Sequence, residues 1–291
     1  MARAAGSGRR RRGAARATPD VFVHGAGKVG AGLTRSLRAV GWKVTLRPQR
    51  RGLPRRIDAD LVVLAIRDRD LAACAEAIAA GGVLVRRPVA VVHCAGALGP
   101  EPLAAMRAPG VTVAQMHPMI SFASPRRTPS LARGQLHVDG DPSAVAVARR
   151  LGRALGMSPR TIAGLDRVAY HAAAGLVANG AAALAAGGLE LLQTAGVVRA
   201  DAVAMLGPLL RSVADNIEVL GLPDALTGPV RRGEAAAVGR HLETLGRLAP
   251  HLVPFYVAAG LAQLPYARRL GEAPPGSLEE IERILRAAAQ R

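Results

Sequence analysis

Glycines at positions 25, 27 and 30 give the spacing GxGxxG directly after a short apolar run. These glycines would permit a tight turn, a close approach of the backbone to a pyrophosphate, and close helix–strand packing. A strand is predicted over residues 20–24, and a helical repeat of apolar residues follows the motif, which favours a dinucleotide site over a plain glycine turn. The cofactor-binding residues expected here are Gly25, Ala26, Gly27, Lys28, Val29 and Gly30.

The end of the second predicted strand, residues 42–46, bears on which dinucleotide is bound. Enzymes that use NAD place an Asp or Glu about twenty residues beyond the glycines to bind the ribose hydroxyls. Here Arg47 occupies that place, with Arg50 and Arg51 after it and no acidic residue nearby. A guanidinium suits the 2′-phosphate of NADP, so the sequence predicts NADP rather than NAD. The alternative explanation is that Arg is abundant throughout this chain.

Two histidines follow predicted strands at the sheet edge where ligands of parallel sheets bind. They are His93 in HCAGAL and His117 in QMHPMISF, and both are candidates for a general acid or base. His117 precedes a proline, which holds its backbone extended. The alternative for each is a structural histidine. Further candidates are Ile66, His93 and Ala95 as cofactor contacts and Ser121 as a substrate contact.

The helical half of the chain offers two more groups of candidates. In YHAAAGLVANG, His171 and Asn179 lie eight residues apart along one helix face. They are candidate catalytic residues, and the alternative is that both are ordinary core residues. In DALTGPVRRGE, Thr227 and Arg231 would bind an anionic substrate, or else form a solvated turn. The sequence has no HExxH, CxxC or GxSxG motif, and HVDGD suits a strand end followed by a turn, so no metal site is expected.

Apolar runs that alternate with helices predict a mostly parallel, doubly wound sheet covered on both faces. After about residue 164 only helices are predicted, the last of them beginning at a Ser277–Glu280 capping box. The predicted domains are a basic tail (1–18), a Rossmann-like domain (19–163) and an all-helical substrate and dimerisation domain (164–291). Strands are expected over 20–24, 42–46, 60–66, 88–94, 111–116 and 134–140, with helices over 166–196, 199–220 and 234–271.

The formal charge of +18 does not by itself indicate nucleic-acid binding. Six Arg fall in the first 17 residues, and only seven aromatic residues are present in the whole chain. Binding of single strands requires stacking platforms, so specific nucleic-acid binding is not expected. Two cysteines without a CxxC pattern indicate a reducing compartment, and we expect a cytoplasmic protein.

An uncharged stretch over residues 172–189 approaches the length of a membrane span. Its Ala and Gly contribute little insertion energy, and Asn179 lies within it. We therefore expect a buried helix rather than a membrane segment. The small side chains also suit close packing against a second copy, which predicts a homodimer.

Five segments together resemble a known family. GAGKVG, HCAGAL, MHPMISF, YHAAAGLVAN and ALTGPVRRGE, over about residues 20–265, resemble an uncharacterised family of Rossmann-like proteins. Its C-terminal helical domain of unknown function is related to that of 6-phosphogluconate dehydrogenase. The resemblance implies a nicotinamide-dependent oxidoreductase of the wider group that holds prephenate dehydrogenase, ketopantoate reductase and pyrroline-5-carboxylate reductase. His117 looks like the substrate-contacting histidine of the prephenate dehydrogenase HPxxG segment, but Ser121 replaces its glycine.

The predicted function is an NADP-dependent oxidoreductase that transfers a hydride between nicotinamide and a small carbonyl, imine or hydroxy-acid substrate in an interdomain cleft. His117 would transfer the proton, with His171 and Asn179 closing the site. Ala95 stands where the family often has Ser, and Arg67 where it tends to have Pro. These departures keep a second hypothesis open, a non-catalytic NAD(P)-binding sensor or partner protein.

Overall fold

The computed structural model describes residues 18–290, so almost all of the predicted basic tail lies outside the described residues. The chain divides into two compact units, one ending at Gly175 and one beginning at Leu176. The division falls inside a long helix, α4 (Arg167–Thr194), whose first two turns belong to the first unit. Each unit is described by itself.

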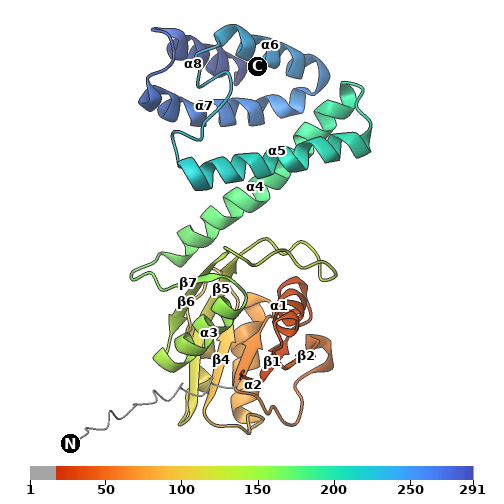
Figure 1. Ribbon diagram of the computed structural model, residues 1–291, viewed down its shortest axis with the longest axis vertical. Coiled ribbons are helices and arrows are strands. Elements are labelled where there is room, and N and C mark those ends of the chain that lie inside the picture. Colours follow the sequence, from red (N-terminus) through yellow and green to blue (C-terminus); the bar gives the residue numbers. More distant parts are fainter. Residues whose placement is uncertain (1–17, 291) are drawn as a thin grey trace, which may run out of the picture. The chain divides into compact units, whose positions relative to one another are not determined.

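The first unit is built around a seven-stranded sheet with the strand order β2-β1-β3-β4-β5-β6-β7 (Figure 1). All neighbouring strands are parallel except β5 and β6, which are antiparallel. The strands are β1 (Val21–His24), β2 (Val44–Arg47), β3 (Leu61–Leu64), β4 (Val89–His93), β5 (Val111–Met119), β6 (Gln135–Gly140) and β7 (Ser158–Arg160). The helices are α1 (Lys28–Ala39), α2 (Leu71–Ala80) and α3 (Pro142–Ala154), with 3₁₀ turns η1 (Gln49–Arg51), η2 (Asp68–Asp70) and η3 (Glu101–Met106).

Both faces of the central strands are buried, as their continuous apolar runs predict. Side chains of α1 and α3, such as Leu37 and Leu151, cover one face of the sheet. Side chains of α2 and η3, such as Ile78 and Leu103, cover the other. The carboxyl ends of β1, β3 and β4 therefore point to one common edge, where loops carry the candidate residues.

The second unit continues α4 and adds α5 (Arg199–Leu220), α6 (Ala235–Leu248), η4 (Pro250–Leu252), α7 (Val253–Leu270) and α8 (Ser277–Ala288). Buried residues such as Val238, Leu264 and Ile281 hold α6, α7 and α8 together. The predicted helical run over 234–271 is interrupted at Pro250, because proline lacks the N–H that continues a helix. The predicted capping box does not form: the Ser277 hydroxyl donates to the carbonyl oxygen of Pro274.

The long helix α4 differs from the sequence prediction. None of its residues is buried, and Leu176 and Val177 are 77% and 71% exposed, so the prediction of a buried helix is wrong for the single chain. Among the described helices, α4 is long and apolar enough to cross a membrane, by length and composition alone. Apolar residues of α5, including Leu209 and Val213, are exposed as well. A second copy would cover these surfaces in the homodimer, which stays a prediction.

Candidate functional site

A cavity of about 580 Å³ lies at the carboxyl ends of β1, β3 and β4. It is formed by the turn between β1 and α1, the segment after β3 and the loop after β4. Predicted cofactor residues make up much of its wall. Its lining residues are Gly25, Ala26, Gly27, Lys28, Val29, Gln49, Ala65, Ile66, Arg67, Asp68, Cys94 and Ala95.

The three glycines have different surroundings. Gly25 adopts φ +109°, a conformation that favours glycine, and a Cβ there would lie 2.2 Å from the carbonyl oxygen of Ala65. A Cβ on Gly30 would lie 1.9 Å from the carbonyl oxygen of Gly25. A Cβ on Gly27 would meet no protein atom within 4 Å. Gly25 and Gly30 are thus required by the fold, whereas Gly27 leaves space open in the cavity wall.

The cavity has the electrostatic character of a phosphate site. Helix α1 begins at Lys28, and no side chain caps its first turn. Its free N–H groups and the positive end of the helix dipole therefore face the cavity lined by Gly27 and Val29. The side chains of Lys28 and Arg67 add two positive charges to the wall, and that of Asp68 adds one negative charge. Burial raises the pKa of the nearby Cys94 thiol to about 12, so this cysteine is not a thiolate nucleophile.

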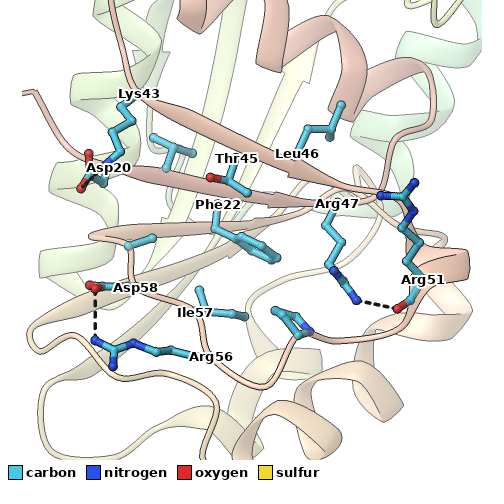
Figure 2. A pocket seen from close by; sticks show the side chains of 13 residues that line it. Asp20, Phe22, Lys43, Thr45, Leu46, Arg47, Arg51, Arg56, Ile57 and Asp58 are labelled. Atoms are coloured by element: carbon cyan, nitrogen blue, oxygen red, sulfur yellow. Dashed lines mark hydrogen bonds and ion pairs between the residues drawn. The ribbon is translucent and has the colours of Figure 1, made fainter.

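Arg47 does not line this cavity. Its guanidinium donates hydrogen bonds to the carbonyl oxygens of Gly52 and Arg51, at 2.6 and 2.7 Å. Figure 2 shows the side chain reaching along a second cavity, of about 320 Å³, toward Arg51. The predicted phosphate ligand thus holds the loop that follows β2 and carries Arg50. Its direct contact with the cofactor remains a prediction.

His93 holds the loop that follows β4. Its side chain is fully buried, its Nε2–H donates to the carbonyl oxygen of Gly99 at 2.6 Å, and its Nδ1 accepts the N–H of Ala95 at 3.1 Å. Burial lowers the pKa of His93, which suits this neutral ring. Both ring nitrogens are therefore engaged, and His93 shapes the cavity through Ala95 instead of offering a nitrogen to a ligand.

A polar stripe runs along one face of β5 and β6, and we define it as Gln115, His117, His137 and Asp139. The antiparallel register places Gln115 opposite Asp139 and His117 opposite His137. Their neighbours on the other face, such as Met116, are part of the apolar core. The first two turns of α4 cover the stripe, where Arg167 pairs with Asp139 and the Tyr170 ring contacts both histidines.

His117 stands at the centre of this arrangement. The ring of His171 lies edge-on to it at a centroid distance of 5.6 Å, and Tyr170 Oη lies 3.3 Å from its Nδ1. Burial, with repulsion from His171, His137 and His93, lowers the pKa of His117 to about 4. A Cβ on Gly96 would lie 2.8 Å from His117 Nε2 and 2.3 Å from His171 Nδ1. Ala95 lines the glycine cavity, and the next residue of the same loop, Gly96, lies directly against both imidazoles.

A hydrogen-bond chain that sequence analysis missed connects this loop to the stripe. The fully buried Gln115 donates from Nε2 to the carbonyl oxygen of Ala95 at 3.0 Å, and its Oε1 lies 2.9 Å from His137 Nδ1. The alternating pattern of polar residues in QMH and HVD is the signal that could have revealed Gln115 and His137. Tyr170 had no comparable signal, because its partner His117 is 53 residues away in sequence.

The other predicted site residues make no described contact with the glycine cavity or the polar stripe. Ser121 is exposed in the loop after β5, and Asn179 and Thr227 are exposed in the second unit. The guanidinium of Arg231 forms a bidentate pair with Glu272 at 2.6 and 2.7 Å and donates to the carbonyl oxygens of Asp224 and Leu226. Arg231 thus closes its own turn, which leaves at most one N–H for an anionic substrate. The described residues contain no group of three side chains suited to a metal ion.

Comparisons with known proteins bear on the family and on the fold. Residues 135–263 match the family described as DUF2520, a domain of unknown function. The predicted resemblance to an uncharacterised Rossmann-like family with a C-terminal domain of unknown function is confirmed. No curated protein sequence matches the chain.

Solved structures of other proteins share the fold of this chain. A candidate NADP oxidoreductase from Bacteroides fragilis is 18% identical with a TM-score of 0.67, over 84% of this chain and 98% of that one. Pyrroline carboxylate reductase from Plasmodium falciparum, solved with NADP bound, is 11% identical with a TM-score of 0.58, over 94% and 97%. Imine reductase from Pseudomonas sp. is 19% identical with a TM-score of 0.52, over 94% and 99%. The predicted Rossmann-like domain followed by a helical domain is confirmed, and the chain shares this fold with these reductases.

Proposed function

We propose that this protein is an NADP-dependent oxidoreductase acting on a small substrate beside His117. One observation carries the proposal: the loop after β4 lines the glycine cavity at Ala95 and touches the imidazoles of His117 and His171 at Gly96. A nicotinamide held in the cavity would supply the hydride. The imidazoles would stand beside the substrate atom that changes protonation.

The preference for NADP over NAD is supported by the charges around the cavity. The loop after β2 has no acidic residue for the ribose hydroxyls, whereas Arg50 lies in η1 and Arg67 lines the cavity. The bond from Gln49 Nε2 to Asp70 Oδ2, at 3.0 Å, ties this loop to η2 beside the cavity. Arg47 would act by holding the loop in place.

Cofactor preference is tested by titrating the purified chain with NADPH and NADH, followed by nicotinamide fluorescence. We expect NADPH to bind at least about 10-fold more tightly, because a 2′-phosphate gains charge-assisted hydrogen bonds. The double variant Arg50→Ala, Arg67→Ala should lose most of this preference. Arg69→Ala is the matched control, since Arg69 is exposed, lies outside the cavity and pairs with Asp70 at 3.7 Å. Equal affinities in the unaltered chain would contradict the NADP assignment.

Turnover is tested by NADPH oxidation with a panel of small ketones, 2-oxo acids and cyclic imines. His117→Ala should keep its NADPH affinity and lose about 10²- to 10⁴-fold in turnover, as expected for a general acid–base group. Unchanged turnover would remove His117 from the chemistry. If NADPH binds tightly but no panel compound is reduced or its product oxidised, the non-catalytic sensor is the better assignment.

A further inference from the structure

Tyr170 is held rigidly beside His117 by the start of α4. The helix is capped by Asp166, whose Oδ1 accepts the N–H groups of Val168 and Ala169, both at 3.0 Å. Arg167 pairs with Asp139 of the polar stripe, which ties the same turn to β6. These contacts fix the Tyr170 ring in edge contact with His117, at a centroid distance of 5.5 Å.

The direction of the hydrogen bond between Tyr170 and His117 follows from their chemistry. A phenol is a better donor than a neutral imidazole N–H, so the Tyr170 hydroxyl donates to Nδ1 of His117. His117 then carries its hydrogen on Nε2, the nitrogen that faces Gly96 and the loop of the cofactor cavity. Burial keeps the ring neutral near pH 7 by lowering the pKa of His117 to about 4.

His137 does not compete for this role. The carbonyl oxygen of Ala95 accepts a bond from Gln115 Nε2, which orients the amide and leaves Oε1 to accept from His137 Nδ1–H. His137 therefore presents a lone pair on Nε2, a buried atom with no partner among the described residues. The donor that reaches His117 is therefore Tyr170, from α4, and not a residue of the polar stripe.

The charges around His117 disfavour a cationic substrate. The titratable groups that face it are the rings of His171, His137, His93 and Tyr170, together with the Arg167–Asp139 pair. Asp139 is the one carboxylate of the stripe, and Arg167 already neutralises it. Among the described groups of the first unit that face His117 there is thus no unpaired carboxylate to hold an iminium ion, and Asp68 lies in the wall of the glycine cavity.

We infer that Tyr170 is a positioning residue that holds His117 with its hydrogen on Nε2, and that the site takes a carbonyl substrate, whose oxygen accepts this hydrogen bond, rather than an iminium. The inference rests on the proposed function.

In reduction, the hydride forms the new C–H bond and the C=O π pair moves to oxygen. The oxygen takes the Nε2 hydrogen while the Tyr170 hydroxyl proton moves to Nδ1. Water then reprotonates Tyr170 and leaves as hydroxide. Tyr170 also lines a separate cavity of about 300 Å³, through which water can reach it.

A pair of substrates of equal ring size tests the substrate class. Cyclopentanone and 1-pyrroline differ in the reacting C=O or C=N group, and the imine is readily protonated to a cation. We expect NADPH oxidation with the ketone to have the higher kcat/KM near neutral pH. Faster turnover of 1-pyrroline would overturn the inference while leaving the oxidoreductase proposal in place. Failure of both, together with the wider panel, would count against the proposed function itself.

Tyr170→Phe tests the positioning role, because it keeps the ring contacts and removes the hydroxyl. We expect kcat on the best panel ketone to fall on the order of 10- to 100-fold, with KM and NADPH affinity little changed. The matched control is Tyr256→Phe in the second unit, where Tyr256 Oη lies 2.8 Å from His241 Nδ1 in a similar edge contact. Tyr256→Phe should leave kcat unchanged. Equal kcat in Tyr170→Phe and the unaltered chain would contradict the role.

A spectroscopic measurement tests Tyr170 independently of any substrate. Two-bond ¹H–¹⁵N correlation spectra of the unaltered chain near pH 7 should show His117 protonated on Nε2 and unprotonated on Nδ1. In Tyr170→Phe the Nδ1 lone pair loses its donor, so a mixture of tautomers and a higher pKa of His117 are expected. Tyr256→Phe should change the His241 signals alone. A hydrogen on Nδ1 of His117 in the unaltered chain would overturn the inference, whatever the turnover assays give.

Discussion

Alanine at position 30 is expected to destabilise the α/β unit strongly, whereas alanine at position 27 is expected to leave the fold intact and weaken NADPH binding. The two glycines lie three residues apart in the same motif, but a Cβ on Gly30 would lie 1.9 Å from the carbonyl oxygen of Gly25. That oxygen cannot yield easily, because Gly25 is itself held by a 2.8 Å bond from its N–H to the carbonyl oxygen of Arg47. The β1–α1 turn would have to move, at a cost of about 3 kcal/mol or more.

Gly27 lies in open space with φ −72° and ψ −167°, which alanine adopts without strain. Its substitution should therefore leave the melting temperature close to that of the unaltered chain. A methyl group there would occupy the place where the backbone approaches a pyrophosphate, and losing one charge-assisted hydrogen bond costs about 10-fold or more in affinity. Thermal unfolding by circular dichroism and NADPH titration of both variants separate the two effects. A Gly27→Ala chain that binds NADPH normally would argue against a pyrophosphate in this cavity.

The parts of this site that could be predicted from the sequence depend on short-range patterns. The glycine spacing and the buried strands β1, β3 and β4 are visible within windows of a few residues. Each of these reflects local backbone geometry or burial. They predicted the cavity wall, which contains Gly25, Gly27 and Ala95. His117, predicted to follow a strand that ends at residue 116, lies instead within β5.

The parts that could not be predicted depend on contacts between distant residues. Arg47 had the right position for a phosphate ligand, but its guanidinium donates hydrogen bonds to the carbonyl oxygens of Arg51 and Gly52. No pattern of residue types predicts these two bonds. Arg231 forms an ion pair with Glu272, which is 41 residues away in sequence. The polar stripe requires the antiparallel register of β5 and β6, since a shift of one residue would turn His137 to the other face of the sheet.

Acidification should destabilise this protein well above the pH at which carboxylates titrate. Burial lowers the pKa of four histidines, His24, His93, His117 and His137, so each favours the neutral form in the folded state. An unfolded histidine has a pKa of about 6.5, so between pH 6.5 and the folded value the unfolded chain binds more protons. The free energy of unfolding is therefore unaffected by these groups above pH 6.5 and falls as the pH decreases below it. For His117, whose folded pKa is about 4, the loss amounts to at most about 3 kcal/mol.

Measurements of melting temperature at constant ionic strength, in steps from pH 8 to pH 4.5, test this expectation. Because typical domains are stable by only about 5–15 kcal/mol, the loss of stability at these groups should lower the melting temperature measurably within this range. His117→Gln should show a shallower pH dependence below pH 6.5, since it removes a buried imidazole whose pKa in the fold is about 4. A melting temperature that is flat down to pH 5 would mean that these imidazoles titrate in the fold as they do in the unfolded chain, near pH 6.5. His117 would then become an imidazolium below about pH 6.5, able to donate a proton directly, and the tautomer held by Tyr170 would decide what the site can bind only above that pH.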